Sequence, residues 1–544
     1  MSYHALFLRA GSVVSGGRFF ALSILASFLL CACAGEEPEP GQPNILLAIA
    51  DDWGFPHAGT YGDPVVKTPT FDRLAREGIV FNQAYISSPS CTPSRAALLT
   101  GQWHWRLEES ANLWSTLQTK FPVYPDLLEE AGYFVGHTSK AWSPGRLEPG
   151  GRTRNPAGPE FDSFAEFLDS RPGERPFCFW FGTFDPHRPY EPGSGEAAGM
   201  DLDAIRLPAC LPDSPEVRSD VADYYFEVQR FDTHVGELLE ELEKRNELDN
   251  TIIIMTGDHG MPFPRAKGNL YDIGTRVPLA IRWPDLVAGG RHSDDFVSLT
   301  DLAPTILELT GVPVPGAMTG KSLTPILTAK ESGRIDSKRT HVLTGKERHV
   351  PSQEAPDSGG TPMRSIRTRD FLYIYNFRPD RWPAGTPHYE KAFIPGTWYG
   401  DVDNGPTKFY MVDHRNKDDL HRKLFDLAFA KRPAEELYDL KKDPDQLTNV
   451  AADPEYLSIK ARLSEQLMKE LSSTLTLAFW VWGICLTPIP TTEEVHWHGA
   501  GKSNSGLSGE SSVARTIVSA YWLTLHRPRV PPSGPSRQNE KEPR

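Results

Sequence analysis

Residues 91–101, Cys-Thr-Pro-Ser-Arg-Ala-Ala-Leu-Leu-Thr-Gly, place a nucleophilic side chain beside an expected helix start. Pro93 suits the first helical position, because its missing N–H would have no partner there, and Gly101 suits the helix stop. Cys91 would then lie just before the helix N-terminus, where exposed N–H groups and the helix dipole favour an anion. Arg95, one turn further on, adds a permanent positive charge whose donors fit a tetrahedral oxyanion. The run therefore predicts a nucleophile next to an anion-binding site.

Acidic residues follow two continuous apolar runs, residues 45–50 and 251–256, which are typical of strands buried on both faces. Because α/β sheets place ligands at the carboxyl ends of their strands, we expect these acids to converge at one pole. Their mutual repulsion calls for a cation, and carboxylate oxygens favour a hard divalent one. The predicted ligands are the acids that end the two runs, Asp51, Asp52 and Asp258.

Three more candidate residues follow strand-like segments or lie in a loop. A predicted strand over residues 133–138 delivers Lys140, and one over residues 177–181 delivers the turn that holds His187. Lys267 lies in a loop rich in Pro and Gly after Asp258. Taken alone, Lys267 would be an ordinary surface lysine, and only its position beside the predicted metal makes it a candidate.

The elements that must position these residues alternate between strand and helix patterns up to about residue 312, as in a doubly wound, mostly parallel α/β sheet. Helical patterns cover residues 70–77, 125–131 and 216–244, and an apolar strand covers residues 79–84. Beyond them, residues 363–368, 371–375 and 436–440 read as antiparallel strands of a smaller α+β domain. The predicted domains are a signal peptide with lipobox (1–33), a linker (34–43), a catalytic domain (44–335), a C-terminal α+β subdomain (336–471) and a divergent, disordered tail (472–544).

Composition limits the classes of function. The 544 residues are 39% hydrophobic, so the chain can bury a large core. Its net charge of −14 argues against general affinity for nucleic acid or for an anionic membrane, so an anionic substrate needs a local positive pocket. Six cysteines imply no disulfide framework; Cys178 and Cys210 are expected either to pair or to be buried thiols.

The first residues predict export. Arg9 and Arg18 precede an apolar stretch at residues 19–30, which is too short to span a membrane comfortably as a mature helix. Residues 30–33, Leu-Cys-Ala-Cys, resemble a bacterial lipobox with a lipid anchor on Cys33. Ordinary signal cleavage without lipid is the alternative, and either route predicts the periplasm or the cell surface.

The run at residues 91–101 matches the type I sulfatase signature, Cys-x-Pro-Ser-Arg followed by Leu-Thr-Gly. The resemblance extends over residues 44–471 and is closest to the heparan N-sulfatase (N-sulfoglucosamine sulfohydrolase) branch and its bacterial relatives. It implies an alkaline phosphatase-like fold and oxidation of Cys91 to formylglycine by a formylglycine-generating enzyme, the hydrated aldehyde being the nucleophile. The alternative for an isolated cysteine is a buried structural thiol. The further matching stretches are residues 185–188, 231–236, 262–264, 269–271 and 362–364.

The resemblance also implies roles for the remaining candidates. Arg95, Lys140 and Lys267 would spread the negative charge that develops on sulfate, and His187 would protonate the leaving oxygen or nitrogen. His259 stands where the heparan N-sulfatase has Asn and some other sulfatases have His. Imidazole is a softer ligand than an amide oxygen, so this residue defines the metal site more closely than the identity of the metal. The residues implied to bind one Ca²⁺ are Asp51, Asp52, Asp258, His259 and modified Cys91.

Arg348 and His349 follow a predicted strand at residues 341–344. The resemblance places them at the pocket rim, away from the sulfur, where they would hold a carboxylate or hydroxyl of a sugar. A charged loop is just as often ordinary solvated surface.

Two features depart from the family pattern. The family usually has Lys-x-His, whereas this chain has Lys140-Ala141-Trp142, so either another histidine substitutes or turnover is slow. The tail carries an apolar run at residues 475–482 and His-Trp-His at residues 496–498, without a sulfatase counterpart. The candidate substitutes are His57, His104 and His137.

Three functions fit the sequence. The favoured one is hydrolysis of sulfate esters or sulfamates on a sulfated carbohydrate. The second is hydrolysis of phosphodiesters or phosphonate esters within the alkaline phosphatase superfamily. The third is a lipoprotein that binds sulfated glycan with weak or no catalysis, which Trp142 favours slightly.

Overall fold

The computed structural model describes residues 42–474. The predicted signal peptide, the lipobox cysteine Cys33, nearly all of the linker and the tail from residue 475 lie outside the described residues. Within residues 42–474, no helix combines the length and the apolar character that a membrane crossing needs.

A seven-stranded sheet forms the centre of the described part. Four adjacent strands, β4, β5, β1 and β6, are parallel, whereas β7 runs antiparallel to both of its neighbours, β6 and β2. This mixed but mostly parallel sheet confirms the predicted α/β class. In spatial order the strands are β4 (Phe134–Ser139), β5 (Phe177–Gly182), β1 (Asn44–Ala50), β6 (Thr251–Gly257), β7 (Leu279–Arg282), β2 (Ile79–Phe81) and β8 (Arg291–Ser293).

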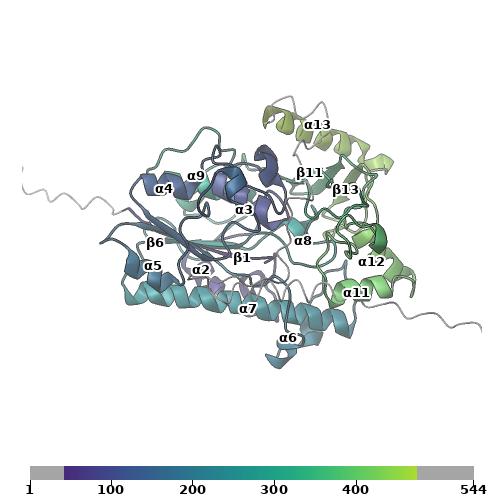
Figure 1. The fold of residues 1–544 in the computed structure, drawn as a ribbon, viewed down its shortest axis with the longest axis horizontal. Helices are drawn as coiled ribbons and strands as arrows, with labels where there is room; N and C mark the ends of the chain where they lie inside the picture. Colours follow the sequence, from purple (N-terminus) through teal and green to yellow (C-terminus); the bar gives the residue numbers. More distant parts are fainter. Residues whose placement is uncertain (1–41, 475–544) are drawn as a thin grey trace, which may run out of the picture. The chain divides into compact units, whose positions relative to one another are not determined.

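Helices cover both faces of this sheet (Figure 1). Along β1, alternate side chains point to opposite faces, so Leu46 and Ala48 join one hydrophobic cluster while Ile45 and Leu47 join another. The first face is covered by α2 (Pro69–Glu77), α5 (Phe164–Ser170) and α7 (Pro215–Lys244). The second is covered by α3 (Cys91–Thr100), α4 (Tyr124–Glu130) and α9 (Leu302–Leu309).

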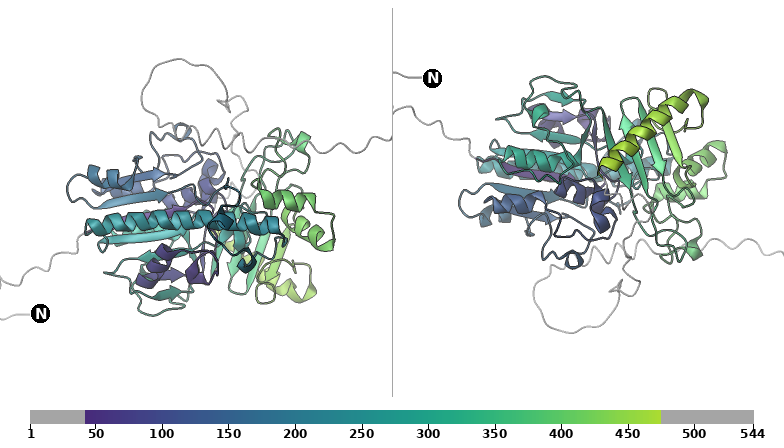
Figure 2. Two further views of the ribbon diagram at one scale, coloured as in Figure 1. Left: turned by 90° about the horizontal axis from the view of Figure 1, so that it is seen from below. Right: turned by 90° about the horizontal axis from the view of Figure 1, so that it is seen from above.

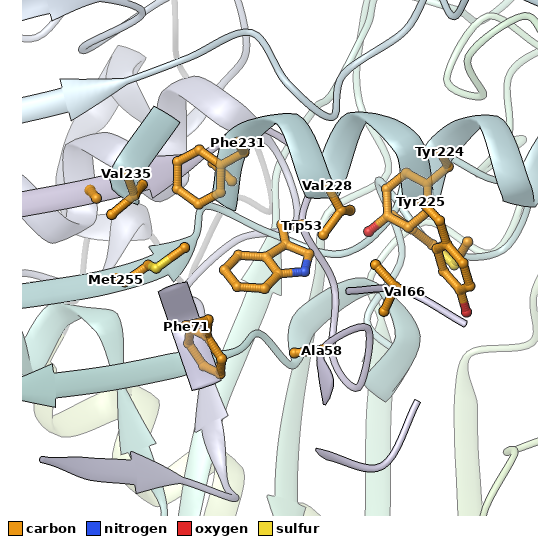
Figure 3. Packing of buried hydrophobic residues seen from close by; sticks show 14 of the residues in the cluster. Trp53, Ala58, Val66, Phe71, Tyr224, Tyr225, Val228, Phe231, Val235 and Met255 are labelled. Carbon is orange, nitrogen blue, oxygen red and sulfur yellow. The ribbon is translucent and has the colours of Figure 1, made fainter. Parts of the chain in front are cut away.

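Trp53 anchors the turn that follows β1. Its indole packs edge-on against Phe71 of α2 and Phe231 of α7, with ring centroids 5.1 and 5.7 Å away (Figure 3). Its Nε1–H donates to the carbonyl of His57 at 2.8 Å. Because the indole is fully buried and its N–H is paired, the two acids just before Trp53 are held by a rigid core rather than by a free loop.

A second, four-stranded antiparallel sheet follows in sequence. Helix α13 (Leu457–Thr474) lies along this sheet (Figure 2), and its buried leucines pack against it. Helices α11 (Pro406–Asp413) and α12 (Asp419–Phe429) join the cluster that contains α7. The strands in order are β10 (His341–Lys346), β11 (Met363–Thr368), β12 (Phe371–Asn376) and β13 (Glu435–Asp439).

Short elements complete the described chain. The short strands and helices are β3 (Ala84–Tyr85), β9 (Val297–Ser298), α6 (Ser194–Ala197), α8 (Asp272–Thr275) and α10 (Thr324–Leu327). The 3₁₀ turns are Gly59–Tyr61, His104–Arg106, Glu108–Ala111, Glu148–Gly150, Leu202–Ala204, Leu299–Asp301, Tyr389–Lys391 and Pro454–Tyr456.

The predicted start of the helix after residue 91 and the predicted strand at residues 79–84 are wrong for local reasons. Helix α3 begins at Cys91 itself, because Ser90 is its extended N-cap residue and the carbonyl of Ser90 accepts from the N–H of Ser94 at 3.0 Å. Pro93 is thus the third helical residue, which also lacks an intrahelical N–H partner. The strand predicted at residues 79–84 is split, because the chain leaves the large sheet after Phe81 and pairs with β9 from Ala84.

Candidate active site

The acids after β1 and β6 meet, as predicted, because the two strands run in parallel and in register to their last residues, Ala50 and Gly257. The side chains of Asp51, Asp52 and Asp258 are fully buried. The backbone N–H of Asp52 donates to Asp258 Oδ1 at 2.9 Å. Asp52 also has φ 76°, a left-handed conformation that is costly for a residue other than glycine. Such strain persists only where the surrounding structure enforces it, here through Trp53 and the paired strands.

Cys91 lies directly over this acidic pole. Its Sγ lies 3.5 Å from Asp51 Oδ1 and 3.3 Å from His259 Nε2. The next turn of α3 is fixed by the Ser94 hydroxyl, which donates to the Asp258 carbonyl at 2.6 Å. Burial, followed by the charge of Asp51, raises the pKa of the Cys91 thiol well above its ordinary value. The unmodified thiol is therefore poorly suited to be a nucleophile, because attack needs the thiolate.

The donor atoms at this pole fit a cation. Asp51, Asp52, Cys91 and His259 each offer an atom within 4.8 Å of the others. His259 Nδ1 lies 3.0 Å from the Gly260 carbonyl, which can only accept, so Nδ1 carries the proton. Nε2 lies 3.1 Å from Asp52 Oδ1, a buried oxygen without a hydrogen-bond partner. With Nε2 deprotonated, as a metal ligand must be, a cation held by both atoms would satisfy this oxygen.

Asp258, predicted as a metal ligand, also accepts hydrogen bonds from Asp52 and Arg95. Its Oδ1 lies 3.6 Å from His259 Nε2, at the edge of the cation-binding group. The same oxygen accepts the N–H of Asp52, and Oδ2 accepts Arg95 Nε at 2.8 Å. Asp258 therefore orients the guanidinium of Arg95 and the strained turn at Asp52.

Three buried cations surround the cysteine. Arg95 also donates Nη1 to the carbonyls of Lys140 and Ala141, at 3.0 and 2.9 Å, while its buried Nη2 has no hydrogen-bond partner. Lys140 forms an ion pair with Asp51. Burial alone would lower the pKa of Lys140, but the charge of Asp51 offsets this and raises the pKa. The pocket therefore holds fixed positive charge, as an oxyanion requires.

Lys267 has two carboxylate partners. Its Nζ donates to Asp52 Oδ2 at 2.8 Å and to Asp403 Oδ2 at 3.0 Å. Burial would lower the pKa of Lys267, but the charges of Asp403 and then Asp52 raise it well above the ordinary value. No sequence pattern pointed to Asp403, which reaches the site from a segment between η7 (Tyr389–Lys391) and α11.

His187 faces the same oxygen of Asp52 as Lys267 does. Its Nε2 is 3.9 Å from Asp52 Oδ2, and its Nδ1 is 2.6 Å from the carbonyl of Arg188. Arg188 is itself buried and forms a bidentate ion pair with Asp220, with both N···O distances at 2.7 Å. The turn that carries His187 is therefore held by a buried charge pair and, through the Asp185 carbonyl, by the N–H of Asp51 at 3.0 Å.

His349 lies closer to the nucleophile than the sequence predicts. Its side chain is only 3% exposed, and Nδ1 lies 2.8 Å from the hydroxyl of Ser90, the residue before Cys91. Burial is the largest cause that lowers the pKa of His349, to about 3, so the ring is neutral. Arg348 donates Nη1 to the Ser358 carbonyl at 3.4 Å. The difference arises because β10 continues to Lys346 and delivers His349 beside the start of α3.

The three histidines considered as substitutes bond elsewhere. His57 lies 3.0 Å from the Tyr225 hydroxyl, His104 lies 2.9 Å from the Ser87 hydroxyl, and His137 lies 3.1 Å from the Gly158 carbonyl. Among the hydrogen bonds described for residues 42–474, none joins these rings to Cys91. Trp142 is buried, and its indole N–H can only donate, so it cannot replace the missing base. Cys178 and Cys210 are buried thiols.

Comparisons with known proteins identify a family domain in this chain. The family model described as Sulfatase matches residues 43–145 and 159–312. N-sulphoglucosamine sulphohydrolase of Homo sapiens is 29% identical over 485 residues, covering 78% of this chain and 89% of that protein. The chain therefore carries a Sulfatase family domain, and its relatives are consistent with a type I sulfatase near the N-sulfoglucosamine branch. The family and its named relatives support sulfuric ester hydrolase activity.

Solved structures support the fold. A protein solved in complex with its substrate D-glucosamine-2-N,6-O-disulfate has a TM-score of 0.54 and 21% identity, covering 80% of this chain and 98% of its own. A phosphonate monoester hydrolase from Silicibacter pomeroyi has a TM-score of 0.57 and 18% identity, covering 80% and 97%. At these identities the likeness concerns the fold, which is therefore the alkaline phosphatase-like arrangement expected from the sequence.

Proposed function

We propose that this protein hydrolyses sulfate esters or sulfamates on a sulfated carbohydrate, with formylglycine made from Cys91 and one divalent cation, Ca²⁺. The observation that carries the proposal is the grouping of Cys91 with Asp51, Asp52 and His259, bordered by the buried cations Arg95, Lys140 and Lys267. A sulfated sugar as substrate is supported by the human N-sulphoglucosamine sulphohydrolase. It is also supported by the structure solved with D-glucosamine-2-N,6-O-disulfate.

Two groups would supply the chemistry, formylglycine at position 91 and a bound divalent cation. Hydrated formylglycine would supply an attacking hydroxyl at position 91, and Ca²⁺ would polarise the sulfate oxygens. Asp51, Asp52 and His259 would hold the cation, with Asp258 at the edge of this group. Carboxylate-rich donors favour a hard cation.

The chain's own cations would bind and orient the sulfate. Arg95 Nη2 lies 3.6 Å from Asp51 Oδ1 and has no hydrogen-bond partner, so it is a buried donor that an anion can satisfy. The ammonium groups of Lys140 and Lys267 would balance the charge that develops on the sulfate oxygens. His187 Nε2 would hold the proton that the leaving oxygen or nitrogen takes when its bond to sulfur breaks.

The test combines mass spectrometry with an activity assay on protein purified from its native host. We expect the peptide that contains residue 91 to have the mass of formylglycine, and the protein to release sulfate from sulfated saccharides. Release should depend on Ca²⁺. Unmodified cysteine together with no sulfate release would refute the proposal and favour a glycan-binding role.

A phosphodiester or phosphonate ester hydrolase is the second candidate, favoured by the shared fold of the phosphonate monoester hydrolase. Turnover of an aryl sulfate and of an aryl phosphate diester by the same preparation separates the two. Greater turnover of the diester would identify the second activity.

Export and lipid anchoring complete the proposal. The lipobox-like residues 30–33 support cleavage before Cys33 and a lipid anchor at the periplasmic or cell surface, after action of a formylglycine-generating enzyme. Replacement Cys33→Ser should move the protein from the membrane fraction to the soluble fraction. An unchanged distribution would contradict the anchor.

A further inference from the structure

The carboxylate of Asp403 enters the cation-rich pocket from the segment 399–405. Its Oδ2 accepts from Lys267 Nζ at 3.0 Å. Asp403, Asp52 and His187 each have a donor atom within 4.8 Å of the others. The side chain of Asp403 is 21% exposed, whereas that of Lys267 is 4% exposed. Asp403 is therefore the more exposed member of this ion pair.

One side of the segment is tied to the backbone beside Lys267. Asp401 Oδ1 accepts from the N–H of Val350 and from the hydroxyl of Ser352, both at 2.9 Å. Asp401 Oδ2 accepts from Lys346 Nζ at 2.9 Å, and the same ammonium donates to the carbonyl of Gly268 at 2.9 Å. One buried lysine thus fixes the position of the segment relative to the residue after Lys267.

A second buried lysine fixes the segment internally. Lys408 Nζ donates to the carbonyls of Tyr399 and Val402, at 3.0 and 2.7 Å, and to Asn404 Oδ1 at 2.9 Å. Three acceptors match the three donors of an ammonium group. The backbone on both sides of Asp403 is therefore held in place.

The other side of the segment is tied to the turn of His187. Thr407 donates its N–H and its hydroxyl to Asp220 Oδ2, at 3.1 and 2.6 Å. Asp220 is also the bidentate partner of Arg188. A Cβ on Gly405 would lie 2.5 Å from the Arg188 guanidinium carbon, so the segment and the arginine are in close contact. Asp403 is thus fixed relative to both Lys267 and His187.

From this geometry we propose that Asp403 is a positioning residue, which holds the Lys267 ammonium in the sulfate pocket on the side of His187. Asp52, the other carboxylate partner of Lys267, belongs to the cation-binding group, whereas Asp403 lies outside the grouping around Cys91. The ion pair with Asp403 fixes the lysine, which would otherwise lose side-chain entropy on each binding event. The catalytic consequence rests on the proposed function, but the effect on anion binding does not.

The test compares Asp403→Ala, Asp403→Asn and Asp403→Glu with the parent protein in the presence of CaCl₂. Asp357→Ala is the matched control, because Asp357 is an acid of the same region whose partner is Arg381. For a small aryl sulfate, we expect kcat of Asp403→Ala to fall at least about tenfold while KM changes less than about threefold. Asp403→Glu, which keeps the charge, should retain more of kcat than Asp403→Ala. Asp403→Asn keeps the side-chain shape, so it replaces Asp403→Ala in the comparison if that variant fails to fold.

Calorimetric binding of inorganic sulfate gives a readout without turnover. If Asp403 positions Lys267, removing it weakens sulfate binding by about twofold to threefold, in line with the small change expected in KM. If Asp403 acts only as a nearby negative charge, its removal strengthens sulfate binding, because a repulsion is lost. The two roles therefore predict opposite signs.

The outcomes are distinct. Unchanged kcat, or stronger sulfate binding, overturns the positioning role. A loss of kcat/KM that appears only as a higher KM for a sulfated saccharide also overturns the positioning role, since Asp403 would then contact the sugar directly. If the parent protein releases no sulfate, the proposed function fails, and the direction of the change in sulfate affinity alone decides the role of Asp403.

Discussion

Glu227 of α7 offers a test of how buried charge around the His187 turn sets stability. Its side chain is 5% exposed and lies beside the carboxyl group of Asp185, with Arg230 Nη1 2.5 Å from Oε2. Burial, followed by the charge of Asp185, raises the pKa of Glu227 from 4.5 to about 7, in spite of Arg230.

The sign of the pH effect follows from this raised pKa. The folded protein binds the proton more tightly than the unfolded chain, so the stabilisation is fully present below pH 4.5 and is lost as the pH rises through about 7. A difference of about 2.5 units corresponds to at most about 3 kcal/mol at pH 8. Glu227→Gln mimics the protonated acid, since its amide can donate to Asp185 and accept from Arg230.

We therefore expect Glu227→Gln to be more stable than the parent at pH 8, by about 1–3 kcal/mol, and nearly equal to it at pH 4. Urea unfolding at the two pH values measures the difference. Asp213→Asn is a control with the opposite expectation, because Asp213 is exposed and Arg218 lowers its pKa. Equal destabilisation of Glu227→Gln at both pH values would show that the carboxylate is needed in its charged form.

Further changes test the site and the turn that supports it. Cys91→Ala should abolish sulfate release with little change in melting temperature, since alanine is a good helix former. Arg188→Met should destabilise the fold by about 3–5 kcal/mol in denaturant unfolding, because Asp220 is left buried without its charge partner. Exhaustive chelation should remove activity and lower the melting temperature, and added Ca²⁺ should restore both. Arg348→Ala should lower kcat/KM for a sulfated saccharide by about tenfold but for an aryl sulfate by less than about twofold, whereas His349→Ala should lower both, because His349 contacts Ser90.

Local patterns sufficed to predict most of the sheet and the acidic pole. The apolar runs before Asp51 and Asp258 are strands β1 and β6, and parallel pairing brings their ends together. Pro93 alone places the start of α3 too late, because the helix begins where the carbonyl of Ser90 accepts from the N–H of Ser94, and no local pattern reveals that hydrogen bond. Local propensity also gives no hint that Asp258 orients Arg95, because that hydrogen bond forms only after the strands and α3 pack together.

The residues that the sequence misplaces or misses come from far along the chain. His349 is 259 positions from Ser90, and Asp403 is 136 positions from Lys267. No periodicity links residues at such separations, and a lone acid in a polar loop resembles ordinary surface. Only the tertiary contacts reveal that these side chains reach the pocket.

The contacts also show that the second sheet contributes to the chemistry. The Asp403–Lys267 ion pair, the Lys346–Gly268 hydrogen bond and the bond from the Tyr271 hydroxyl to Glu436, at 2.8 Å, all cross the boundary predicted near residue 335. Because buried ammonium groups are costly to leave without partners, these links keep the C-terminal strands and the loop of Lys267 in one fixed arrangement. A change in the C-terminal region that moved the 399–405 segment would therefore alter the charge around Lys267 without touching Cys91 or the acidic pole.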